Sequence, residues 1–144
     1  MPIDLTALYE ALDKEPTITL ATCAGKRVTI RPMSHIRRGC ELYFQTGENS
    51  LKMQQIAENP SVAIACGAFE IEGEAAPQGR PLDDPWFAEA YRAKHPEPFA
   101  KYSALPDEIT VKVTIRRVRQ WQYIDGNPLL AEIEVPENEM EEPS

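Results

Sequence analysis

The chain has 144 residues, of which 42% are apolar and 26% are charged, a size and composition typical of one globular domain. Its formal net charge is −8, but six of the 23 acidic residues fall in the last thirteen positions, so the rest of the chain is close to neutral. These values exclude a disordered chain, and they leave room for a binding site for a phosphorylated ligand.

The cysteines and the apolar segments narrow the class further. Cys23, Cys40 and Cys66 are widely spaced, and only two histidines accompany them. That number and spacing favour neither a disulfide framework nor a metal site. No apolar run approaches the roughly 20 residues that cross a bilayer, and the first residues lack the basic-then-apolar order of a signal peptide. We therefore expect a cytoplasmic protein that has no membrane anchor.

The first sixty residues predict two helices and three strands. Apolar periodicity and the turn-prone residues between segments place the helices at 4–14 and 49–58 and the strands at 17–22, 27–33 and 41–46. Pro16 ends the first helix and Asn59-Pro60 ends the second. The turn-prone Ala24-Gly25-Lys26 joins the first two strands into a hairpin.

The next part of the chain predicts two strands and a helical excursion. Residues 61–66 are nearly all apolar, which is typical of a strand buried on both faces, whereas residues 69–74 alternate like a half-exposed strand. The stretch 76–106 is rich in proline and predicts a short helix at 85–94. This excursion contains five aromatic residues, which favour packing or a wall over a binding pocket.

Strands return at 109–118 and 120–124, after which 125–128 leads into an acidic tail over 131–144. The predicted domain therefore spans residues 1–130. Six or so strands with short early connections and few helices favour a mainly β fold, an antiparallel barrel with flanking helices, over an α/β sheet.

A candidate anion site lies at the start of the second predicted helix. If Asn49 caps that helix, Lys52 takes the third helical position, where an acidic or amide side chain would otherwise satisfy the helix start. The free N–H groups, the Ser50 hydroxyl and the Lys52 ammonium would then face one anion, and Arg31 from a neighbouring strand would add a second cation. The alternative is a solvated surface with a simple cap, and spacing alone leaves both open.

The order of these segments resembles the pyridoxamine 5′-phosphate oxidase-like flavoproteins. The matching features are a hairpin with Arg31 near its end, a strand ending in Tyr43-Phe44-Gln45-Thr46, Ser50-Leu51-Lys52 opening a helix, and Asn59-Pro60 before a buried strand. They cover about the first half of the chain. The resemblance implies a split β-barrel that binds flavin mononucleotide (FMN) at the interface of a homodimer.

The resemblance also implies a set of cofactor-binding residues, which are Arg31, Pro32, Met33, Ser34, Gln45, Thr46, Ser50, Leu51, Lys52 and Trp121. Within this set, Arg31, Ser50 and Lys52 would hold the flavin phosphate. The main chain of the two strands would line the ring system and the ribityl chain. Trp121 matches an aromatic residue of the family's last strand that approaches the flavin, and a core position is the alternative for it.

Two departures from the family pattern limit the function. Leu51 stands where the oxidases proper carry a basic residue, and the Glu-rich end replaces their Arg-rich substrate segment. We therefore expect an FMN-dependent oxidoreductase acting on a small molecule other than pyridoxamine phosphate, with no catalytic side chain assigned. The alternatives are a non-enzymatic flavin or haem binder or sensor, and a deazaflavin-dependent reductase.

The other charged and titratable residues give no strong indication of function. Arg37-Arg38 and the cluster from Arg116 to Arg119 are better explained as solvated faces than as a nucleic-acid surface, because the chain is near neutral or acidic elsewhere. Neither His35 nor His95 belongs to a local Ser, Cys or Asp arrangement typical of acid–base catalysis, so exposed or satisfied histidines are expected.

Overall fold

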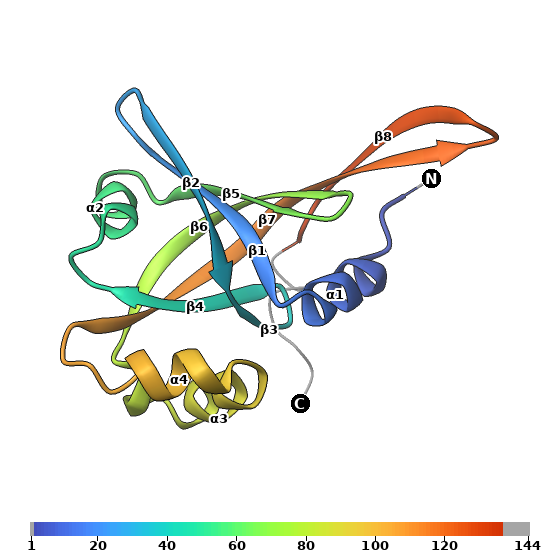
Figure 1. The fold of residues 1–144 in the computed structure, drawn as a ribbon. Helices are drawn as coiled ribbons and strands as arrows, with labels where there is room; N and C mark the ends of the chain where they lie inside the picture. Colours follow the sequence, from blue (N-terminus) through green and yellow to red (C-terminus); the bar gives the residue numbers. More distant parts are fainter. Residues whose placement is uncertain (1, 137–144) are drawn as a thin grey trace.

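The structure, a computed structural model, describes residues 2–136 (Figure 1). Its helices and strands, in chain order, are α1 (Leu5–Lys14), β1 (Thr17–Ala24), β2 (Arg27–Ser34), β3 (Ile36–Arg38), β4 (Glu41–Gly47), α2 (Leu51–Glu58), β5 (Ser61–Cys66), β6 (Phe69–Gly79), the 3₁₀ helix η1 (Pro81–Asp83), α3 (Pro85–Lys94), α4 (Pro96–Tyr102), β7 (Glu108–Ile124) and β8 (Asn127–Glu134). None of the helices in this part of the chain is long and apolar enough to cross a membrane.

The strands form one antiparallel sheet in the order β2-β1-β5-β6-β7-β4-β3, with β8 paired to β7. The two ends of this path, β2 and β3, are separated in the chain by His35 alone. The sheet therefore curls until its ends meet, and it leaves a seam where β2 and β4 approach each other without pairing. The mainly β, split-barrel prediction is confirmed, with eight strands in the described residues instead of six or so.

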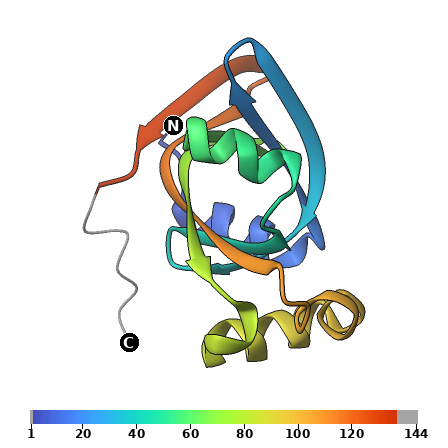
Figure 2. The same ribbon diagram turned by 90° about the vertical axis from the view of Figure 1, so that its left-hand side faces the viewer.

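Helix α1 closes the core as its sequence predicts. The Asp4 carboxylate caps it by accepting a hydrogen bond from the Thr6 N–H at 2.9 Å. Leu8 and Leu12, one turn apart, are fully buried in the barrel core. Figure 2 shows α2 lying across the barrel opening, with α3 and α4 packed together below it.

One strand differs from its prediction in burial. In β5, Val62 and Ile64 are buried in the core, but Ala63 and Ala65 are exposed on the outer face. The prediction that this strand is buried on both faces is therefore wrong for a single copy of the chain. In a β-barrel, alternate side chains point inward, and in the described residues the outer face of β5 has no helix over it.

The end of the domain also differs from the prediction. β7 is one strand without a break near residue 119, and it turns through Asp125 and Gly126 into β8. Both turn residues have positive φ, 52° and 80°, as a two-residue hairpin requires. Residues 131–134 of the predicted acidic tail therefore lie in β8, where Glu134 pairs with Arg117 at 2.7 Å. Residues 137–144 of that tail lie outside the described residues.

The helical excursion forms a second, smaller core. Phe87 and Tyr91 of α3 stack with ring centroids 5.0 Å apart, and Trp86 packs edge-on against Tyr43 of β4 at 4.9 Å. Packing therefore explains most of its aromatic residues. Helix α4 was not predicted, because its two prolines are typical of breaks, although proline is well tolerated in the first turn of a helix.

Candidate functional site

The seam between β2 and β4 gathers most of the predicted site. Arg31 to Ser34 lie on β2, Gln45 and Thr46 on β4, and Ser50 to Lys52 at the start of α2, which follows β4 directly. Because β2 and β4 are not paired, side chains and main chain along this seam stay open to a ligand. The topology therefore brings nine of the ten predicted residues to one region.

Two cations lie close together at one end of the seam. Lys52 Nζ donates to Thr46 Oγ1 at 2.9 Å, and it lies near enough to Arg31 to interact with its charge. Burial, and then the positive charge of Arg31, lower the pKa of Lys52. Burial also lowers the pKa of Arg31. A place where two partly desolvated cations repel each other favours a bound anion.

Arg31 is fixed by its own hairpin. Its guanidinium donates to Leu20 O at 3.2 Å, to Thr22 Oγ1 at 2.9 Å and to Thr29 Oγ1. Both threonine hydroxyls also donate to Gln55 Oε1 of α2, each at 2.6 Å. These contacts hold the arginine in one orientation against α2, and the sequence patterns did not reveal them.

The start of α2 differs from its prediction by one residue. Ser50 is the cap, and its Oγ accepts from the Met53 N–H at 3.4 Å, so Asn49 lies one position outside the helix. Lys52 consequently occupies the second helical position instead of the third. The first turn holds no acidic side chain, so the positive end of the helix dipole is left for an anion.

A cleft of about 200 Å³ lies along the seam, and its lining begins at Pro32, the residue after Arg31. One side is formed by predicted residues, Pro32, Met33, Ser34 and Gln45. The other side is formed by Tyr91 of α3, Pro98 and Tyr102 of α4, and Glu108 of β7. Of these four, only the two tyrosines had a sequence signal, the aromatic cluster of the excursion.

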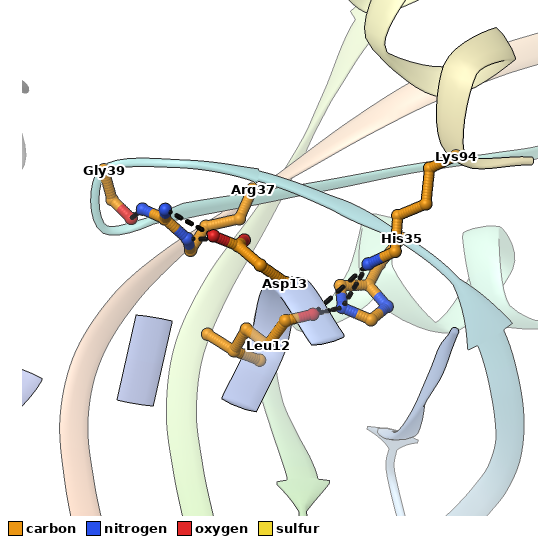
Figure 3. A network of polar contacts seen from close by, with 6 residues as sticks. All are labelled: Leu12, Asp13, His35, Arg37, Gly39 and Lys94. Atoms are coloured by element: carbon orange, nitrogen blue, oxygen red, sulfur yellow. Dashed lines mark hydrogen bonds and ion pairs between the residues drawn. The ribbon is translucent and has the colours of Figure 1, made fainter. Parts of the chain in front are cut away.

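The junction between β2 and β3 is locked by a polar network (Figure 3). His35 is fully buried, its Nε2 donates to Leu12 O at 2.7 Å, and Lys94 Nζ donates to the same oxygen at 3.2 Å. Burial first, and then the charge of Lys94, lower the pKa of His35 to about 4. The neutral ring therefore ties α1, the seam and α3 together, and His95 Nε2 donates to His35 O at 2.8 Å.

Two predicted residues lie away from both the cleft and the pair of cations. Leu51 is 38% exposed and lines a separate hollow with Arg27 and Gln54. Trp121 is 49% exposed and lies opposite Leu130 on the ribbon of β7 and β8, which extends away from α2 in Figure 1. The alternative of a core position for Trp121 is therefore wrong, and one subunit alone does not bring it to the seam.

The arginines and histidines that the sequence analysis considered make contacts within the fold. Arg116 and Arg119 approach Glu74 and Glu70 of β6 at 3.4 and 3.5 Å, and these side chains form a partly exposed face. Arg38 lies 3.8 Å over the ring of Trp86. Each histidine uses its Nε2 in a hydrogen bond to a main-chain oxygen, while Nδ1 of His35 is buried without a hydrogen-bond partner in the described residues. Within residues 2–136 no group of three His, Cys, Asp or Glu side chains could hold a metal ion.

Solved structures with the same fold include proteins of several functions. General stress protein 26 from Bacillus anthracis is 20% identical, with 91% of this chain and 100% of that chain covered and a TM-score of 0.63. A FAD-binding protein from Mesorhizobium loti is 11% identical, with 81% and 92% covered and a TM-score of 0.64. The haem storage protein HutZ from Vibrio cholerae is 14% identical, with 80% and 91% covered and a TM-score of 0.63. At these identities the likeness shows the fold alone.

Among curated protein sequences, none matches the chain. The family model described as pyridoxamine 5′-phosphate oxidase matches residues 5–122, which span the barrel from α1 to the end region of β7. This match covers most of the chain and includes both sides of the seam. The chain therefore belongs to the pyridoxamine 5′-phosphate oxidase family.

Proposed function

We propose that this chain binds FMN along the seam and acts as an FMN-dependent oxidoreductase on a small molecule. The observation that carries the proposal is the pair of partly buried cations, Arg31 and Lys52, at a helix start that has no acidic residue. A phosphate dianion would remove the repulsion between them and accept hydrogen bonds from both. The donor set therefore fits the terminal phosphate of FMN.

The cleft beside the cations would hold the flavin ring system. Pro32, Met33 and Ser34 on one strand and Gln45 on the other would lie along the ring and the ribityl chain. Bound FMN supplies hydride or electron transfer. The chain's own residues bind and orient it, and the α3–α4 wall limits the access of water to the cleft.

A homodimer is part of the proposal. Val28 and Ile30 of β2 are 66% and 68% exposed, next to the exposed small residues Ala63 and Ala65 of β5. A second copy over this face would bury these apolar groups, and it would give β5 the second buried face that its sequence favours. The resemblance that predicts Trp121 near the flavin then requires the tryptophan to come from the partner subunit's β7–β8 ribbon.

The dimer is tested by its mass in solution. We expect light scattering to give twice the 16.2 kDa of one chain, and a V28K/I30K variant to give monomers with weakened FMN binding. The control is Leu82→Lys, which places a lysine on an exposed apolar residue of η1 and leaves the dimer intact. A wild-type monomer that retains its flavin contradicts this part of the proposal.

Haem is the second candidate, because the haem storage protein HutZ shares the fold. Histidine is a frequent axial ligand of haem iron. Both histidines of this chain are buried, and each uses Nε2 in a hydrogen bond to a main-chain oxygen. The side chains therefore favour a flavin over a histidine-ligated haem.

The absorption spectrum of the purified protein separates the candidates. We expect flavin bands and the release of FMN on denaturation. In the native protein a reduced nicotinamide donor should reduce the bound flavin, and an electron acceptor should then reoxidise it. A Soret band without flavin overturns the proposal in favour of haem. A colourless protein that binds only added deazaflavin overturns it in favour of the deazaflavin-dependent reductase.

A further inference from the structure

The cleft is lined by a carboxylate that has no hydrogen-bond partner in the described residues. Glu108, the first residue of β7, is only 6% exposed, and its side chain lines the cleft. In the part of the chain that the structure describes, its carboxylate makes no hydrogen bond or ion pair. Arg80 Nη1 donates at 3.0 Å to the main-chain oxygen of Glu108, which fixes the backbone and leaves the carboxylate free. A carboxylate that faces a cleft without a protein donor is available to accept a hydrogen bond from a ligand.

The cation whose charge acts on this carboxylate does not satisfy it. Lys52 interacts with the charge of Glu108, but its Nζ donates to Thr46 Oγ1 and it lies beside Arg31. Burial and then the charge of Asp107 raise the pKa of Glu108, and the charge of Lys52 lowers it. The carboxylate is therefore left to face the cleft while the lysine is directed to the anion site.

A second unsatisfied polar group lies near Glu108. Gln45 of β4 is 6% exposed, its Oε1 accepts from Ser103 Oγ at 2.7 Å, and its Nε2 is buried without an acceptor in the described residues. Gln45 pairs with Thr110 across the β4–β7 ladder, and Glu108 is two residues from Thr110. The two side chains therefore share one face of the sheet as diagonal neighbours, with a typical residue spacing of roughly 7–8 Å and a somewhat shorter distance between their Cβ atoms.

We propose that Glu108 and Gln45 recognise a lactam or imide edge, a carbonyl next to an N–H, with Glu108 accepting from the N–H and Gln45 donating to the carbonyl. This inference rests on the proposed function, because such an edge belongs either to the flavin ring in the cleft or to an amide substrate beside it. The same pair disfavours a carboxylate in the cleft, since that group would face Glu108 with no donor for it.

Two matched pairs of probes distinguish the two sources. Riboflavin and 3-methylriboflavin differ only in the ring N–H, and both lack the phosphate. Nicotinamide and N,N-dimethylnicotinamide differ only in the amide N–H, and they are titrated into the FMN-loaded protein. We expect one of the unmethylated probes to bind roughly tenfold or more tightly than its methylated partner. The pair that discriminates identifies the source, and equal affinities within both pairs overturn the proposal.

Variants of Glu108 assign the effect to this residue. Glu108→Leu removes the acceptor and should abolish the discrimination, whereas Glu108→Gln keeps an acceptor oxygen and should retain most of it. Glu89→Gln is the control, since it removes an exposed acid of α3 and should change nothing. Discrimination that persists in a folded Glu108→Leu variant overturns the assignment. If that variant does not fold, Gln45→Leu provides the test. It removes the amide donor, and it must weaken the binding of the unmethylated probe.

The phosphate proposal fails separately from this one. Riboflavin carries no phosphate, so its comparison with 3-methylriboflavin does not depend on Arg31 or Lys52. FMN binding no tighter than riboflavin would contradict the phosphate site and leave the edge recognition standing. FMN binding that is much tighter than riboflavin binding, together with equal affinities within both methylated pairs, would support the phosphate site alone.

Discussion

The cationic end of the seam and the wall of the cleft opposite β2 and β4 come from different parts of the chain. The cationic end comes from one short stretch of chain, with Arg31 on β2 and Thr46, Ser50 and Lys52 around the start of α2. The opposite wall comes from α3, α4 and the first residue of β7, much later in the chain. An anion site at a helix start is encoded by local sequence, whereas the chemistry of the wall depends on how distant segments pack. Ligand affinity and ligand choice should therefore respond to different mutations.

The largest effect is expected at the cationic end. The double variant R31A/K52A should weaken FMN binding by roughly 100-fold or more, because it removes at least two charge-assisted contacts worth about 1.5–3 kcal/mol each. The measurement is equilibrium titration of the apo-protein with FMN. The control K26A/R27A removes the same charge from exposed positions near the same hairpin. Equal FMN affinities for the two double variants would refute the phosphate assignment.

The free energy of unfolding should depend on pH through His35, at the junction between β2 and β3. The pKa of His35 is lowered from 6.5 to about 4 in the folded state, so between these values the unfolded state binds more protons. The free energy of unfolding should therefore fall as pH decreases from 6.5 to 4, by about 3 kcal/mol from this residue, and the contribution is fully present above pH 6.5.

Denaturant titrations across that range measure this dependence. His35→Gln keeps a donor for Leu12 O and cannot titrate, so its stability should vary less with pH than that of the wild type. His95→Gln is the matched variant and should retain most of the wild-type slope. An unchanged slope in His35→Gln would show that other groups cause the acid sensitivity.

A smaller effect is expected where the wall meets the barrel. Trp86→Ala removes the ring that contacts Arg38 and Tyr43, and it should lower the free energy of unfolding by about 1–3 kcal/mol. Trp86→Phe keeps an aromatic ring and should lose less. The ratio of FMN to riboflavin affinity should stay unchanged in both variants, since the phosphate site does not involve this contact. A reduced ratio would mean that the wall and the phosphate site are not independent.

The smallest effect is expected from a residue that orients a cation. Thr46→Val removes the acceptor at 2.9 Å from Lys52 Nζ and keeps the shape of the side chain. FMN binding should weaken between about twofold and tenfold, as for the loss of one hydrogen bond worth roughly 0.5–1.5 kcal/mol. Thr114→Val, on β7 away from the seam, is the control. A loss as large as that of the double variant would place Thr46 in direct contact with the phosphate.

Local signals predicted the elements that form the cationic end. The hairpin of β1 and β2, the start of α2 and the breaks at Pro16 and Asn59-Pro60 each depend on a few adjacent residues. The one-residue error at the cap of α2 arose because Asn49 and Ser50 are both good capping residues. Such choices are decided by backbone angles that spacing does not reveal.

Long-range contacts explain what was missed. β8 had a usable signal, since Asp125-Gly126 is a favoured hairpin turn, but its alternating glutamates resembled a solvated tail until paired with Arg117 of β7. Glu108 had no signal of its own. It becomes a candidate only when β4 and β7 pair and the excursion covers them, which is a property of the whole fold.

The most direct test of the central claim compares the affinities of FMN and riboflavin for the wild-type apo-protein. The two ligands differ only in the phosphate, so their ratio measures what the phosphate group contributes. If Arg31, Lys52 and the start of α2 grip that group, FMN should bind roughly 100-fold more tightly or better, and high salt should reduce the difference. Equal affinities would contradict the account.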